Sequence, residues 1–237
     1  MGTSDSWCWI KEGSGIYSVK SAYVELIGVI GLDSEESRVF RRLWQTRSPS
    51  NQIAFAWKVI INRVQTRTDL ARRHALPINF SLVCGLCATE DENCQHLFFS
   101  CQVSWTVWMK LYDWLGIKTV LLIDVESHFR QHENLLLVSK KAWSSLLLIW
   151  IAAVNAIWQC RNGSVFRGER VEVDRIVELV QYKVWKWLRT KENNFLSSFY
   201  EWVLIQAICG GLDAGELCCI AHCADFFVGA LHLALAF

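Results

Sequence analysis

The chain has 237 residues, of which 52% are hydrophobic and 20% are charged, with 24 basic side chains against 23 acidic ones. This composition excludes a disordered or low-complexity protein, because such chains lack the apolar surface needed to offset the loss of backbone entropy on folding. Two prolines and 13 glycines also exclude a collagen-like or proline-rich architecture.

The near-neutral net charge hides an uneven distribution. Residues 1–37 carry two lysines against six acids, whereas residues 38–78 carry nine basic side chains against a single acid, Asp69. A local excess of this size is typical of a segment that faces a polyanion, but it also suits a solvated helix face that pairs with the acidic N-terminal segment. Both interpretations stay open at this point.

The N-terminal half predicts a small hairpin followed by helices. Trp7 and Trp9 alternate with Cys8 and precede a turn, so residues 5–17 are expected to form a β-hairpin. The helices expected next are Val19–Ile27 after Ser18, one around Phe40, Leu43 and Trp44, one marked by Ile53, Trp57, Ile60 and Ile61, a short one capped by Thr68, and Val103–Leu115 ending at Gly116.

The C-terminal half predicts two long helices. Residues 142–158 are apolar with a 3.6-residue period but fall short of about 20 residues, so we expect a buried helix and no membrane span. Residues 174–189 predict an amphipathic helix. The expected fold is mostly α, with a zinc-binding domain at 5–116, a polar linker at 117–136, a helical region at 137–205 and an apolar, Cys-rich tail of unknown role at 206–237.

Four potential metal ligands lie within 18 residues. They are Cys84, Cys87, His96 and Cys101. A Cys-x-x-Cys turn directs two thiolates at one ion, and a later His and Cys complete a tetrahedral set that favours a structural Zn²⁺. Two alternatives remain open: Cys94 replaces one ligand, or the four side chains are unrelated buried residues. The acids at 90–92 are expected to be solvated.

Other motifs are weak or absent. The cluster at 218–223 holds three cysteines and a histidine too close together for one tetrahedral site, and is interpreted as incidental thiols. We find no Gly-rich phosphate loop, no nucleophile elbow and no His-Glu-x-x-His helix. No paired carboxylates lie on an otherwise apolar strand, as the metal ligands of a polymerase or nuclease would, and the histidines outside the two clusters are isolated. We therefore expect neither an enzyme nor a small-molecule substrate.

The basic segment supplies candidate phosphate ligands. Guanidinium groups bind phosphates bidentately and release counterions from nucleic acid. The candidates are Arg63, Arg67, Arg72 and Arg73. The expected partner is RNA or DNA, and the tryptophans are expected to be core residues before stacking surfaces.

The order of these motifs resembles a known family. The residues that carry the resemblance are Trp7-x-Trp9, Gly15–Tyr23, Leu43-Trp44, Phe55–Trp57, Asn62–Thr66, Leu70–Arg73, Cys84-x-x-Cys87, Glu92, His96–Phe99, Cys101 and Val107-Trp108. They are similar to the zinc-binding domain that follows the reverse transcriptase in plant LINE-type (non-LTR) retroelement polyproteins. A weaker resemblance continues through Trp150, Trp158 and Arg161-Asn162.

The resemblance implies a non-catalytic, zinc-dependent module related to nucleic acid. Ser50-Asn51 departs from the family's usual lysine-containing step, and the sequence shows neither a polymerase aspartate pair nor a ribonuclease H domain. We therefore expect a retroelement-derived fragment. The alternative is a structural remnant or a scaffold that docks a protein partner through its apolar helices 142–158 and 174–189. Without a recognisable secretory signal, we expect an intracellular location, nuclear or cytoplasmic.

Overall fold

The computed structural model describes residues 8–10, 13–18, 21, 41–134, 140–191 and 197–209. The chain divides into two compact units, residues 1–45 and 46–237, and each is considered by itself. The expected tail at 206–237 and the cysteine cluster at 218–223 lie outside the described residues, except for the helical end at 206–209.

The β-hairpin expected at residues 5–17 is wrong for the part that the structure describes. Residues 8–10 and 13–18 contain a turn but no strand. One backbone hydrogen bond, from Trp9 N to Gly15 O at 2.8 Å, and an edge-to-face contact between Trp9 and Tyr17 hold the turn. A lone two-stranded ribbon is marginal in water, so alternation alone does not secure a ladder. The helix expected at 19–27 lies almost entirely outside the described residues.

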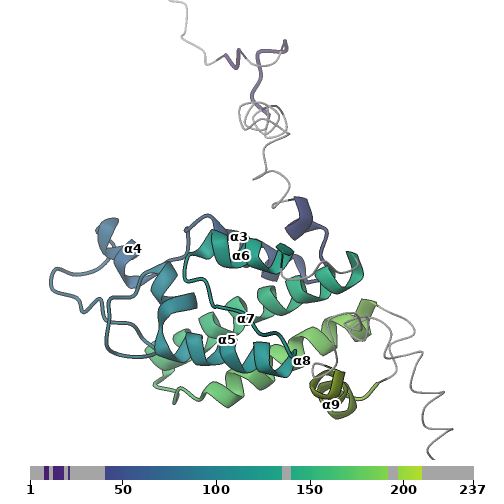
Figure 1. Ribbon diagram of the computed structural model, residues 1–237. Helices are drawn as coiled ribbons and strands as arrows, with labels where there is room; N and C mark the ends of the chain where they lie inside the picture. Colours follow the sequence, from purple (N-terminus) through teal and green to yellow (C-terminus); the bar gives the residue numbers. More distant parts are fainter. Residues whose placement is uncertain are drawn as a thin grey trace, which may run out of the picture. The chain divides into compact units, whose positions relative to one another are not determined.

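The second unit is built from helices (Figure 1). The described elements are α3 (Ser50–Ile60), α4 (Arg67–Arg72), η1 (His96–Ser100), α5 (Gln102–Trp114), α6 (Val125–Asn134), α7 (Lys140–Arg167), α8 (Val173–Lys191) and α9 (Phe199–Cys209). The only pairing of strand type among the described residues is an isolated antiparallel bridge between Val83 and Asp91. The expectation of a mostly helical protein is confirmed.

Helix α7 is the centre of the unit. It packs against α3, α6, α8 and η1, and every residue from 146 to 157 is buried. Residues 146–157 of the periodic apolar run are therefore core, as expected. No helix in the described part of the chain has both the length and the apolar character that crossing a membrane requires.

Helix α7 also runs further than the sequence indicated. The apolar period predicts a helix only as far as residue 158, but the helix continues to Arg167 and stops before Gly168, whose φ is +64°. A left-handed glycine is the common way to end a helix, whereas Gly163 keeps helical geometry. The helix expected at 174–189 is confirmed as α8, with Ile176, Val180 and Val184 among its buried residues.

The segment expected to be a polar linker contains a helix. Residues 125–134 form α6, which packs on α3 and α7. Val125, His128 and Phe129 lie on its buried face, and Asp124 Oδ2 accepts a hydrogen bond from Ser127 N at 2.9 Å at its start. Only three of its side chains are described as buried, and one of them is polar, so the apolar residues show no clear helical period in the sequence. Residues 117–134 therefore belong to the same compact unit as the helices that α6 contacts.

A buried histidine joins the aromatic core. His128 is fully buried, and its ring lies 4.5 Å from the ring centres of both Phe99 and Trp108. Trp150 Nε1 donates to His128 Nδ1 at 3.0 Å, and His128 Nε2 lies 3.0 Å from the Tyr112 hydroxyl. Since Nδ1 accepts a hydrogen bond, the neutral ring carries its proton on Nε2. Phe99 belongs to η1, so this aromatic core contacts the segment that supplies His96.

Candidate metal centre

The first two ligands lie in a tight loop. The chain segments that enter and leave this loop are joined by two backbone hydrogen bonds. Cys84 N donates to Glu90 O and Glu92 N donates to Leu82 O, both at 2.7 Å. Within the loop, Ala88 N donates to Cys84 O at 3.0 Å, and Ala88 adopts a φ of +57°. The short ladder fixes both ends of the turn, so the two thiols of the Cys-x-x-Cys motif are held on one side of it.

The third and fourth ligands are brought together by a single π-helical turn. Cys101 N donates to His96 O at 2.7 Å, which closes a turn five residues long. In an α-helix, residues five apart would point about 140° from each other. The wider turn directs His96 and Cys101 to the same side, which is a common use of π-turns at functional sites.

Neighbouring side chains satisfy the carbonyl groups of this irregular turn. Ser104 Oγ donates to Leu97 O at 2.5 Å, and Trp108 Nε1 donates to Phe98 O at 2.8 Å. Both donors come from α5 and both residues are fully buried. The start of α5 thus stabilises the geometry that aligns the two ligands.

The four side chains form one cluster. Their ligand atoms, three Sγ and one imidazole nitrogen, all lie within 4.8 Å of one another, and His96 Nε2 is 3.3 Å from Cys87 Sγ. Cys84, His96 and Cys101 are buried and Cys87 is partly exposed. Three sulfurs and one nitrogen at this spacing suit a tetrahedral Zn²⁺ with no open position.

The electrostatic setting prepares one sulfur for a cation. A hydrogen bond from the Cys84 thiol lowers the pKa of Cys101. The backbone amides of Ser104 and Val103, at the start of α5, lower this pKa further, although the Cys101 side chain forms no capping hydrogen bond with the helix. The same contact with Cys101, together with burial, raises the pKa of Cys84. The two pKa values move in opposite directions because the hydrogen bond stabilises the thiolate of Cys101 and the thiol of Cys84. Both sulfurs would bind a metal ion as thiolates.

The outer nitrogen of His96 faces an acid. His96 Nδ1 lies 3.2 Å from Glu90 Oε2, within ion-pair range but without hydrogen-bond alignment. A carboxylate beside the second ring nitrogen orients a ligating histidine and leaves Nε2 for the metal. Glu90, expected to be a solvated acid, is indeed largely exposed, but it also has this contact.

Cys94 is not part of the cluster. Its thiol donates to Val59 O of α3 at 3.7 Å, and burial raises its pKa to about 12. The alternative in which Cys94 replaces a ligand is therefore not supported by the geometry. The four residues Cys84, Cys87, His96 and Cys101 come together as expected.

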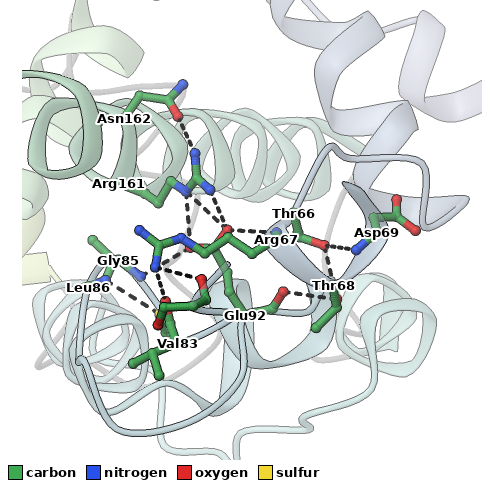
Figure 2. Close-up of polar contacts among 12 residues, drawn as sticks. Thr66, Arg67, Thr68, Asp69, Val83, Gly85, Leu86, Glu92, Arg161 and Asn162 are labelled. Carbon is green, nitrogen blue, oxygen red and sulfur yellow. Dashed lines mark hydrogen bonds and ion pairs between the residues drawn. The ribbon is translucent and has the colours of Figure 1, made fainter. Parts of the chain in front are cut away.

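The structure corrects the expectation that Glu92 is solvated. Glu92 is fully buried, and its carboxylate accepts hydrogen bonds from Arg67 N and Gly85 N, each at 3.1 Å (Figure 2). Its carbonyl accepts from Thr68 N and Thr68 Oγ1. Glu92 thus ties the ligand loop to the first turn of α4. Because the Thr68 hydroxyl is bonded to Glu92, it does not cap α4 as expected. Thr66 caps the helix instead, and its side chain accepts a hydrogen bond from Asp69 N at 3.4 Å.

The counter-ion of Glu92 comes from α7. Arg161 Nε lies 3.1 and 3.0 Å from the two carboxylate oxygens, and Arg161 Nη2 donates to Oε1 at 2.5 Å. The guanidinium carbon also lies 5.0 Å from the Trp158 ring centre, while Nη1 donates to Asn162 (Figure 2). The sequence alone did not predict this ion pair. The available signal was Arg161 itself, a single charged residue that follows a long apolar run.

The ligand loop also touches α7 directly. A Cβ atom at Gly85 would lie 2.5 Å from Val165 Cγ2, which is too close for any side chain to fit without movement. Glycine in the Cys-x-x-Cys turn is therefore required by the approach of the helix. The loop and α7 form one packed structure.

The four candidate phosphate-binding arginines lie in different settings. Arg63 is exposed. Arg72 and Arg73 are exposed but both form ion pairs with Asp69. Arg67 is partly buried, and its Nη1 donates to Val83 O at 2.6 Å and to Ser81 O at 3.3 Å, which gives it a role within the ligand loop.

Comparison with known proteins agrees with this geometry. Residues 17–108 match the family model described as zinc-binding in reverse transcriptase. The matched segment covers less than half of the chain but contains all four cluster residues, and it confirms the resemblance found in the sequence. Together, the match and the Cys₃His cluster indicate a zinc-binding module.

A relative from Arabidopsis thaliana extends the comparison. The protein named "Putative ribonuclease H protein" is 29% identical over 111 residues, which cover 46% of this chain and 17% of the relative. The chain thus spans less than a fifth of that relative's length. No solved structure matches the chain significantly.

Proposed function

We propose that the chain is a non-catalytic, zinc-stabilised module of retroelement origin that binds nucleic acid. The observation that supports this proposal most directly is the convergence of four ligand atoms within 4.8 Å. The matching family model, described as zinc-binding in reverse transcriptase, supports a link to reverse transcription. The relative named as a ribonuclease H protein is consistent with a retroelement polyprotein.

The metal would be structural. Cys84, Cys87, His96 and Cys101 would hold Zn²⁺ with all four positions filled by protein, so no site is left for a reacting water. A structural zinc of this kind contributes on the order of 10 kcal/mol to ordering its ligands. Here the ordered parts are the ligand loop, η1 and, through Glu92, the start of α4.

Nucleic-acid binding is supported by charge. Three arginines are exposed around α4, beside the ligand loop: Arg63 precedes the helix, Arg72 ends it and Arg73 follows it. Asp69 partly neutralises Arg72 and Arg73. A surface of this type binds phosphates with an affinity that falls as salt rises, because bound cations are released from the nucleic acid.

Two measurements test the proposal. Native mass spectrometry of the full chain should give one zinc per chain for the wild type and none for Cys84→Ser, with Cys160→Ser as a matched control outside the cluster. Fluorescence anisotropy with labelled single-stranded RNA and DNA should show affinity that decreases linearly with salt on logarithmic axes. A metal-free, well-folded wild type would contradict the zinc part, and absent binding at low salt would contradict the nucleic-acid part.

A protein-interaction scaffold is the second candidate. The apolar stretch 142–158 does not serve it, because residues 146–157 are enclosed in the core. The observation that favours it is on α9, where Tyr200 and Leu204 are 80% and 62% exposed. Sedimentation of the purified chain, compared with a Tyr200→Ser/Leu204→Ser variant, would reveal self-association through this surface.

A further inference from the structure

Two open pockets meet along α8, and they differ in charge. Both are lined by Leu179 and Tyr182. The larger, about 760 Å³, lies near the α7–α8 connection, and its three arginines are matched by three glutamates. The smaller, about 470 Å³, lies between the start of α3 and the C-terminal half of α8. We call the smaller one the α3–α8 groove.

The α3–α8 groove has cations but no acid among its lining residues. Arg47, Lys183 and Lys186 line it, together with Asn51, Gln52 and Trp187 among others. The two lysines are three residues apart on α8, so their side chains lie on one face of the helix. A concave surface with one sign of charge concentrates the field and attracts a polyanion.

Lys183 is held in place by a neutral partner. Its Nζ lies 3.5 Å from Gln52 Oε1 of α3. Burial lowers the pKa of Lys183, because its ammonium group has lost water contacts without gaining a counter-charge. A phosphate in the groove would supply that charge. Lys186, by contrast, is exposed at the rim of the groove, so its side chain is free to adjust its position to a bound phosphate.

The start of α3 adds to the positive field. Helix α3 begins after Pro49 with no acidic residue in its first turn and no side chain bonded to its first amides. Asn51 and Gln52 of that turn line the groove. The dipole of an 11-residue helix favours an anion there.

The arginines of α4 are less available by comparison. Arg72 and Arg73 share Asp69, and Arg67 donates to the carbonyl groups of Ser81 and Val83. Lys183 and Lys186 line a groove that has no acid among its own lining residues, and the half-exposed ring of Tyr182 lies beside them. Cationic grooves flanked by aromatic rings are characteristic of single-strand binding.

We propose that the α3–α8 groove binds the phosphate backbone of a single-stranded nucleic acid, with Lys183 and Lys186 on the phosphates and Tyr182 as a stacking surface. This inference rests on the proposed function, and it moves the principal contact from the α4 arginines to α8. RNA and DNA share the phosphodiester chemistry that the groove recognises.

The test compares three variants of the full, zinc-loaded chain. They are Lys183→Gln/Lys186→Gln in the groove, Arg72→Gln/Arg73→Gln on α4, and Lys118→Gln at an exposed control position. Binding to labelled oligouridylate and oligothymidylate is followed by anisotropy across roughly 50–200 mM salt. Circular dichroism and zinc content confirm folding, and the exposed single variant Lys186→Glu replaces the groove variant if Lys183 proves necessary for folding.

The groove variant should lose affinity about tenfold, and its logarithmic salt slope should fall by about 1.4, which is the loss of two phosphate contacts on a single strand. The Lys118 control should match the wild type, and the α4 variant should change less than the groove variant. If only the α4 variant lost affinity, the proposed role of the groove would be wrong, whereas the proposed function of the chain would stand. Failure of the wild type to bind either oligonucleotide at low salt would overturn both.

Discussion

Glu92 and Arg161 form an ion pair across 69 residues of sequence, with 0% and 4% of their side chains exposed. The pair joins the loop that carries Cys84 and Cys87 to the central helix α7. Five hydrogen bonds reach the Glu92 carboxylate from Arg161, Gly85 and Arg67. A buried charge needs this degree of compensation, because desolvation costs several kcal/mol per ion.

Replacing Arg161 should therefore destabilise the whole unit. Arg161→Met leaves the Glu92 carboxylate buried without its counter-ion, and the expected cost is about 3–5 kcal/mol in the free energy of unfolding. Arg170→Met is the matched control, because that arginine is 88% exposed, and its effect should stay within about 0.5 kcal/mol. Urea denaturation measures both. Equal stability of the two variants would show that the buried pair contributes nothing.

A methyl group at Gly85 should also be costly. The Gly85→Ala Cβ would overlap Val165 Cγ2, and overpacking of this kind costs about 1–3 kcal/mol. Val165→Ala removes the obstructing group, so the double variant should be more stable than the sum of the two single effects predicts. Gly13→Ala, where nothing lies within 4 Å, is the control. Strict additivity in thermal unfolding would contradict the contact.

The buried histidine should prove structural. His128→Leu deprives the Trp150 indole of its acceptor and the Tyr112 hydroxyl of one partner, each worth about 1–3 kcal/mol when left unsatisfied. Combining it with Trp150→Phe removes donor and acceptor together, so the double variant should lose less than the sum. His74→Asn serves as an exposed control with a left-handed backbone that asparagine tolerates. A neutral His128→Leu would refute this role.

Cys94 should behave as an inert core thiol. Its pKa of about 12 lies above the usual value, so at pH 8 almost no thiolate is present, and reactivity appears only as pH rises toward that value. Iodoacetamide at pH 8 should modify exposed Cys8 long before Cys94. Peptide mass spectrometry measures the order, and Cys94→Ala should retain one zinc per chain. Loss of zinc from that variant would instead make Cys94 a ligand.

Local patterns were sufficient for much of the fold and for the four cluster residues. The period of 3.6 residues identified α5 and α8 because their buried faces are continuous. The Cys-x-x-Cys spacing with a later His and Cys identified the cluster because all four lie within one short segment. In both cases the information is contained in neighbouring residues.

Features that depend on distant partners were not predicted. Glu92 sits between two other polar residues in a loop, and nothing nearby distinguishes it from a solvated acid; its partner lies on α7. Helix α6 was missed because only a few of its side chains are buried, among them the polar His128. The π-turn at His96–Ser100 has no local signature, since Ser104 and Trp108 of the next helix stabilise it.

The buried pair also bears on how this module can be divided. A polypeptide cut after Trp108, the last residue of the family match, would retain every sulfur and nitrogen of the cluster. It would nevertheless lose Arg161 and the surface of α7 that covers Gly85 and η1. Expression of the matched segment alone should therefore yield a chain that chelates metal yet lacks a cooperative transition, whereas adding residues 109–191 should restore one.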